Sequence, residues 1–112
     1  MTEAKAELLK GTLDMLILKA VAAGPSHGYG IARWLESRSG DLLQIEEGSM
    51  YPALYRMEGK GWITSEWGRT ETNRRAKFYH LTARGRERLK TESEGWDRLV
   101  KAVSLVMHAQ PV

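Results

Sequence analysis

Apolar residues recur at helical spacing in four segments, residues 11–24, 28–39, 47–61 and 82–108, and two short runs of β-forming residues lie between the last two. The first segment is apolar nearly all the way round a helix, and residues 1–10 before it are polar, so we expect them to be loosely ordered. A helix that is apolar on several sides of a small domain must be covered from two directions. The domain's own core can cover one side of this helix, and the second apolar side suggests contact with a partner subunit.

The segment from Glu47 to Gly61 predicts a short helix with both ends marked. Ser49 is a favourable N-cap residue, and the two glycines at positions 59 and 61 end the helix. Apolar side chains at i, i+4 and i+7 share one face, which we expect to be buried: Met50, Leu54 and Met57. The opposite face carries hydroxyls, a proline and cations, namely Ser49, Pro52, Tyr55, Arg56 and Lys60, with Tyr51 at its margin. Such a face is typical of a helix that enters a DNA groove, and it is also compatible with tyrosines that pack against a neighbouring element.

Two β-type runs, residues 62–67 and 77–81, predict a hairpin whose tip, residues 68–76, is polar and basic. Asn73, Arg74 and Arg75 lie at this tip, and Lys77 follows them. A basic tip can enter a minor groove or lie along phosphates. The same composition is compatible with a solvated loop when no DNA is bound.

The last segment, residues 82–108, predicts the longest helix of the chain. Leu89, Trp96 and Val103 are spaced seven residues apart, as are Leu99 and Val106, which is the spacing of a short coiled-coil seam. Because the preceding elements already provide a core, we interpret the seam as a dimer interface, with packing inside the same chain as the alternative. Trp96 is also the candidate for binding a small aromatic effector, and its alternative role is that of a large interface anchor.

The positive charge of the chain is concentrated in one segment. Between residues 69 and 90 the cations outnumber the anions by six, whereas the whole chain has a net charge of +3, so the remainder is net negative. Localised positive charge favours phosphate as a partner. The alternative is a solvated helix start that is rich in arginine.

Length and composition limit the classes of protein. A chain of 112 residues has room for one domain with a single core, and 42% apolar with 28% charged residues is typical of a soluble globular protein. We find no membrane span, no signal peptide in residues 1–10 and no cysteine, so we expect a cytoplasmic protein without disulfides and without membrane association.

The sequence gives no support for an enzyme. The stretch from Gly24 to Gly28 matches the G-x-S-x-G motif of hydrolases, but that motif needs a preceding strand and a large parallel sheet. The three histidines, His27, His80 and His108, have no metal-ligand spacing, and no paired-carboxylate site is visible. We therefore expect no catalytic residue, no metal and no cofactor.

Four separate motifs resemble the PadR-like transcriptional regulators. They are His27-Gly28-Tyr29-Gly30-Ile31, Gly48-Ser49-Met50-Tyr51-Pro52-Ala53-Leu54, Gly61-Trp62-Ile63 and the stretch from Arg74 to Gly85. The resemblance runs from about Leu13 to Leu89, and the short C-terminal part is similar to the subgroup with one long C-terminal helix. It implies a mostly α, α+β fold: a winged helix-turn-helix domain over residues 1–81 and a dimerisation helix over residues 82–112, together one compact unit.

The resemblance also implies functional residues. Ser49, Tyr51, Pro52 and Tyr55 would lie on the recognition helix, and Gly28 and Tyr29 would open the helix that approaches the DNA backbone. Asn73, Arg74, Arg75 and Lys77 would belong to the wing, while Arg56 and Lys60 are phosphate ligands suggested by their charge. The expected dimer interface comprises Leu89, Trp96, Leu99, Val103 and Val106.

The implied function is sequence-specific binding of double-stranded DNA by a homodimeric regulator. Family members are typically repressors, and some release DNA when a small aromatic molecule binds. The alternative is a winged-helix module that binds another protein and shows no specific DNA binding. The operator, the regulated genes, the effector and the sign of control lie beyond what the sequence predicts.

Overall fold

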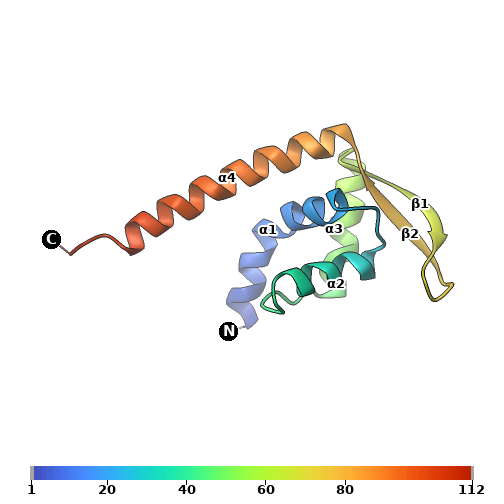
Figure 1. Ribbon diagram of the computed structural model, residues 1–112, viewed down its shortest axis with the longest axis horizontal. Coiled ribbons are helices and arrows are strands. Elements are labelled where there is room, and N and C mark those ends of the chain that lie inside the picture. The colour runs from blue at the N-terminus through green and yellow to red at the C-terminus, as the bar shows by residue number, and fades with distance from the viewer. Residues whose placement is uncertain (1, 112) are drawn as a thin grey trace.

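The computed structural model describes residues 2–111, with side chains from residue 12 onward. Within this range the chain forms four α-helices and a two-stranded antiparallel sheet (Figure 1). In chain order the elements are α1 (Thr2–Ala22), α2 (Gly28–Arg38), α3 (Glu47–Gly59), β1 (Ile63–Arg69), β2 (Arg75–Leu81) and α4 (Ala83–Met107). The predicted α+β, mostly α, winged helix-turn-helix fold is confirmed.

Helix α1 is longer than the sequence pattern predicted. It begins at Thr2 rather than at residue 11, so the prediction that residues 2–10 are loosely ordered was wrong. Those residues are mostly Ala, Glu, Lys and Leu, which are strong helix formers. The single Gly11 costs a helix only about 1 kcal/mol relative to alanine, too little to end a helix whose later turns are packed.

Helix α2 has side-chain and backbone signals at its two ends. Nδ1 of His27 accepts a hydrogen bond from the backbone N–H of Gly30 at 3.1 Å and so caps the first turn. After the helix, Gly40 and Asp41 both have positive φ, 61° and 64°. Glycine adopts this conformation freely and aspartate more easily than most residues, so the chain turns sharply here.

Helix α3 begins before the predicted cap. Glu46 occupies the N-cap position without a side-chain hydrogen bond, and the backbone N–H groups of Ser49 and Met50 both bond to its carbonyl. The prediction that Ser49 is the N-cap was therefore wrong, and Pro52 lies inside the helix rather than in its first turn. Proline removes the hydrogen bond to the carbonyl of Gly48, which lies on the exposed side of the helix.

Strands β1 and β2 form the predicted hairpin with a shorter tip. The register pairs Trp67 with Lys77 and Arg69 with Arg75, which leaves residues 70–74 as the tip. Asn73 has φ of 62°, its N–H donates to the carbonyl of Thr70, and the Thr70 hydroxyl accepts from the N–H of Arg74 at 3.1 Å. The tip is therefore held in one turn conformation by its own polar groups.

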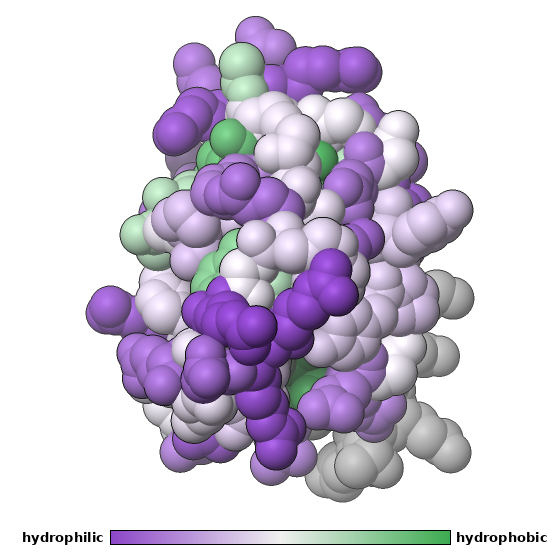
Figure 2. Space-filling model, turned by 90° about the vertical axis from the view of Figure 1, so that its right-hand side faces the viewer, coloured by the Kyte–Doolittle hydropathy of each residue, from purple (hydrophilic) through white to green (hydrophobic). Residues whose placement is uncertain are grey.

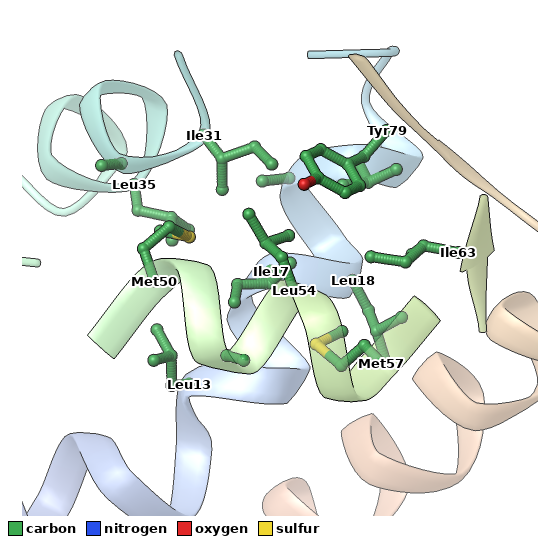
Figure 3. Close-up of a cluster of buried hydrophobic side chains, with 14 of the residues drawn as sticks. Leu13, Ile17, Leu18, Ile31, Leu35, Met50, Leu54, Met57, Ile63 and Tyr79 are labelled. Atoms are coloured by element: carbon green, nitrogen blue, oxygen red, sulfur yellow. The ribbon is translucent and has the colours of Figure 1, made fainter. Parts of the chain in front are cut away.

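The core lies where α1, α2, α3 and the base of the hairpin meet (Figure 3). As predicted, Met50, Leu54 and Met57 of α3 are buried, each no more than 1% exposed. Around them lie Leu13, Ile17 and Leu18 of α1, Ile31 and Leu35 of α2, Ile63 of β1 and Tyr79 of β2. Each such aliphatic side chain contributes roughly 1.5–3 kcal/mol by leaving water. The core therefore fixes α3 against α1 and α2.

Helix α4 begins at a tight joint with the segment that follows α3. Oγ1 of Thr82 accepts a hydrogen bond from the N–H of Gly85 at 3.0 Å and lies 2.6 Å from the carbonyl oxygen of Gly61. From this joint α4 runs beside α1 and extends beyond the globular part, which contributes to the molecule's extent of 61 × 31 × 20 Å (Figure 1).

Candidate nucleic-acid interface

A groove of about 1120 Å³ lies between the start of α2, the exposed face of α3 and the hairpin. Figure 2 looks toward the side of the molecule on which the hairpin tip lies, and strongly hydrophilic side chains cross its centre. Seven predicted DNA-binding residues line this groove: Gly28, Tyr29, Tyr51, Tyr55, Arg74, Arg75 and Lys77. The fold thus brings residues from three separate motifs to one concave surface.

The exposed face of α3 presents two tyrosines to the groove. Tyr55, which lies opposite the buried Met50 and Met57, is 82% exposed, and Tyr51, at the margin of this face, is 53% exposed. Ser49 and Pro52 are also exposed on α3, although they do not line the groove. A helix that offers phenol rings and hydroxyls in this way can contact both base edges and phosphates.

Gly28 is buried and supports Tyr51 instead of facing the solvent. A Cβ atom at position 28 would lie 2.9–3.0 Å from the ring and hydroxyl of Tyr51, so the absence of a side chain allows the ring to rest on α2. Gly28 is buried, whereas all the other predicted DNA-contact residues are exposed. Its supporting role could not be found from the motif without knowing which residue packs on it.

The hairpin organises its cations around a tryptophan that sequence reasoning missed. Trp67 is 57% exposed, and the guanidinium of Arg75 lies 4.4 Å from its ring centroid, with Nζ of Lys77 at 5.8 Å. Cross-strand register puts these side chains on one face of the sheet. Cations over an aromatic face are attracted to it, so the ring holds both charges at the groove.

Charges at the groove are predominantly positive. Its lining contains Arg69, Arg74, Arg75 and Lys77, against two acidic residues, Glu58 and Glu71. Oε2 of Glu58 accepts a hydrogen bond from the Ser65 hydroxyl at 2.6 Å. The groove can therefore attract an anion of extended shape.

Tyr79 forms part of the inner wall of the groove and is 6% exposed. Burial raises the pKa of its hydroxyl above 10.0, and the nearby charge of Glu58 and the phenol of Tyr51 raise it further. This hydroxyl therefore stays protonated under ordinary conditions and adds no negative charge to the groove.

Two predicted phosphate ligands on α3 lie away from the groove lining. Arg56 forms an ion pair with Asp14 of α1, and Nζ of Lys60 lies 4.9 Å from the ring centroid of Trp62. The geometry thus favours the wing arginines over Arg56 and Lys60 as phosphate ligands. Asn73 is exposed at the tip but does not line the groove.

The C-terminal half of α4 carries a strip of exposed apolar side chains. Trp96 is 38% exposed, and the strip continues through Leu99, Val100, Val103, Val106 and Met107, which are 46–72% exposed. Leu89 differs, because it packs against the core of its own chain. An uncovered apolar strip of this length on a helix marks an interaction surface.

The family's sequence model, described as the transcriptional regulator PadR-like family, matches residues 17–91. The chain belongs to this family. The match covers α2, α3, the hairpin and the start of α4, and so contains the whole groove lining. PadR-like proteins are transcriptional regulators that bind DNA and are not enzymes.

Solved structures of similar chains agree with this assignment. A transcriptional regulator from Clostridium thermocellum is 29% identical, with a TM-score of 0.81 and coverage of 93% of this chain and 99% of that one. A PadR-like transcriptional regulator from Bacillus cereus is 26% identical, with a TM-score of 0.80 and the same coverage. A PadR family regulator from Eggerthella lenta is 28% identical, with a TM-score of 0.81 and coverage of 97% and 93%.

The described residues contain neither a metal-binding cluster nor a membrane-spanning helix. Over residues 2–111 no three His, Cys, Asp or Glu side chains are placed to hold a metal ion, and no helix there combines the length and apolarity needed to cross a bilayer.

Two groove residues besides Trp67 also escaped the sequence analysis. The ring of His27 meets the ring of Phe78 edge-on, with centroids 5.2 Å apart, and both line the groove. Phe78 comes close to α2 because Ser26, just before α2, forms an isolated antiparallel β-bridge with Tyr79, the next residue of β2. The isolated residue Ser26 carries no strand pattern, so this pairing had no signal in the sequence.

Proposed function

We propose that this PadR-like regulator binds double-stranded DNA sequence-specifically as a homodimer and acts as a repressor. The observation that carries the proposal is the shared groove, in which exposed tyrosines of α3 and wing cations face one concave surface. DNA fits both parts, because it offers base edges to an inserted helix and phosphates to nearby cations.

The two parts of the groove would have different tasks. Tyr51 and Tyr55 would enter the major groove with Ser49 and Pro52, where a hydroxyl can bond to a phosphate and a ring can contact a thymine methyl group. Arg74, Arg75 and Lys77, with Asn73 at the tip, would bind the backbone and provide affinity for any sequence. Tyr29, at the start of α2, would approach the backbone on the other side.

The dimer would form through the apolar strip of α4. Trp96, Leu99, Val103 and Val106 are at heptad-related positions and are exposed in the single chain. Pairing two such helices would remove this apolar surface from water and place two recognition helices roughly 34 Å apart, one turn of duplex DNA. Residues 1–81 and 82–112 would then serve DNA binding and dimerisation as one unit, joined at Thr82.

Repression and ligand release are family-level expectations that we carry to this chain. A dimer bound across a promoter blocks access to it. Trp96 does not line the groove, and a slot for an aromatic effector at this exposed residue would form where two subunits meet. Trp96 serves equally well as an interface anchor.

The proposal is tested by fluorescence anisotropy over a salt series, with the duplex upstream of the chain's own gene and a scrambled duplex of the same length. We expect tight binding that favours the upstream duplex, a steep fall in affinity with salt and two chains per site. Weak and equal binding to both duplexes would show that the operator lies elsewhere. The absence of salt-dependent binding would support the alternative, a winged-helix module for protein partners.

A further inference from the structure

We propose that the imidazole of His27 is a DNA-binding group that donates a hydrogen bond from Nε2 to a backbone phosphate. The inference deepens the proposed function and rests on it. Neither the motif comparison nor the charge pattern assigned a role to this side chain. Three observations carry it: the bond made by the other ring nitrogen, the packing of the ring and its position in the groove.

The cap of α2 determines which nitrogen of the neutral ring carries the proton. Nδ1 of His27 accepts the hydrogen bond from the N–H of Gly30, so it must present a lone pair. The proton of a neutral imidazole then resides on Nε2, which makes Nε2 a donor. Among the described residues Nε2 has no hydrogen-bond partner of its own.

The ring is held in one orientation from several sides. It stacks on Tyr29 with an interplanar angle of 5° and meets Phe78 edge-on. A Cβ atom at position 30 would lie 2.4 Å from the Ser26 hydroxyl and 3.3 Å from the His27 ring, so the glycine makes room for the folded-back histidine. A donor held in this way loses little conformational entropy when it binds.

The surroundings of the ring favour a phosphate. His27 lines the groove together with the hydroxyl-bearing rings of Tyr29 and Tyr51 and with the wing cations Arg74 and Arg75. The groove as a whole is lined by more cations than anions. A DNA backbone that crosses from the wing to α2 would meet cations first and then the neutral donor of His27.

Two substitutions separate the cap from the donor. His27→Asn keeps a short side-chain oxygen that caps a helix well but lacks an atom at the place of Nε2. His27→Gln places an amide N–H₂ near the position of Nε2 but caps poorly. The control is His108→Asn, the same substitution at the end of α4, far from the groove along the chain.

Wild-type protein and the three variants are compared by thermal unfolding and by DNA anisotropy at pH 8, where an ordinary histidine is neutral. We expect His27→Asn, which keeps the cap but loses the ring contacts with Tyr29 and Phe78, to remain folded at the assay temperature and to lose affinity about tenfold. Its salt slope should be unchanged, because a neutral donor releases no counterion. We expect His27→Gln to lower Tm by about 4–8 °C while it retains most of the affinity.

The outcomes distinguish this inference from the function on which it rests. If wild-type protein shows no salt-dependent DNA binding, the proposed function fails. If wild-type protein binds and His27→Asn binds equally well, only the role of His27 is refuted. A salt slope that falls by about one unit in His27→Asn would also overturn the inference, because the ring would then act as a cation.

Discussion

At the scale of single residues, close packing connects the two helices of the helix-turn-helix unit. Gly28 of α2 supports the ring of Tyr51 of α3, and no side chain fits between them. Tyr51 is itself half exposed, so its ring can move outward when it is pushed. The position of this hydroxyl in the groove therefore depends on the glycine.

We predict that Gly28→Ala lowers DNA affinity without lowering stability. The new methyl group displaces the Tyr51 ring, and we expect a loss of about 3–10-fold in affinity, the value of one hydrogen bond. Alanine is also the better helix former, which offsets the crowding in the free energy of unfolding. Anisotropy and thermal unfolding measure the two effects separately.

Gly59→Ala is the matched control, because a Cβ atom there meets nothing within 4 Å. It should bind DNA as the wild-type protein does. If Gly28→Ala also keeps full affinity, the hydroxyl of Tyr51 does not need its present position for binding.

At the scale of elements, the joint between the segment after α3 and the start of α4 connects the part of the chain that forms the groove to the helix that carries the apolar strip. A Cβ atom at Gly85 would lie 2.0 Å from the carbonyl oxygen of Trp62, and the same carbonyl accepts a hydrogen bond from the N–H of Thr82. The contact is between backbone atoms of Trp62 and of the first turn of α4, so the two segments have little freedom to move apart. The direction of α4 relative to the groove is set here.

We expect Gly85→Ala to destabilise the protein by about 1–3 kcal/mol, the usual cost of an overpacked buried site. Chemical denaturation at a fixed protein concentration measures the free energy of unfolding. Gly95→Ala in the same helix is the control, since its Cβ would approach only the end of the Arg98 side chain, at 3.9 Å. That change should stabilise the helix by roughly 0.5–1 kcal/mol. Equal stability of Gly85→Ala and wild-type protein would show that the joint yields easily.

At the scale of the whole molecule, the single chain leaves the apolar strip of α4 uncovered. The hydrophobic side chains of α4 beyond Trp96 are about half exposed or more, although the helix is well formed there. The groove and this strip lie on different elements, so a change in one surface can leave the other intact.

We predict that Val103→Asp converts the dimer to monomers while the domain stays folded. The new carboxylate would be buried against the partner without a counter-charge, which costs several kcal/mol. Sedimentation velocity at micromolar concentration reports the mass, and circular dichroism reports the helix content. Monomers should also bind operator DNA more weakly, because the two recognition helices of a dimer no longer bind as one unit.

The control is Lys101→Gln, which changes the net charge by the same single unit on the opposite side of the predicted seam. It should remain dimeric. A wild-type protein that sediments as a monomer, or a Val103→Asp variant that stays dimeric, would refute α4 as the interface.

The elements of the fold followed from local sequence patterns. Heptad and i, i+4, i+7 spacings located α4 and the buried face of α3, because a helix repeats its geometry within a few residues. Two runs of β-forming residues on either side of a polar stretch located the hairpin. The predicted starts of α1 and α3 were wrong. Gly11 and Ser49 were taken as helix boundaries, but both lie inside helices. Packing of the later turns outweighs the effect of a single unfavourable residue on where a helix begins.

The composition of the groove depended on contacts between distant residues. Arg56 was expected at phosphate, but α1 brings Asp14, 42 residues earlier in the chain, beside it. Trp67 lies beside the wing cations because the cross-strand register places it opposite Lys77. His27 lines the groove because the preceding residue, Ser26, pairs with Tyr79. Spacing along a chain encodes which face of a helix or strand a residue occupies. Which face meets which neighbour is set by how the helices cross and the strands pair, and these depend on the packed core as a whole.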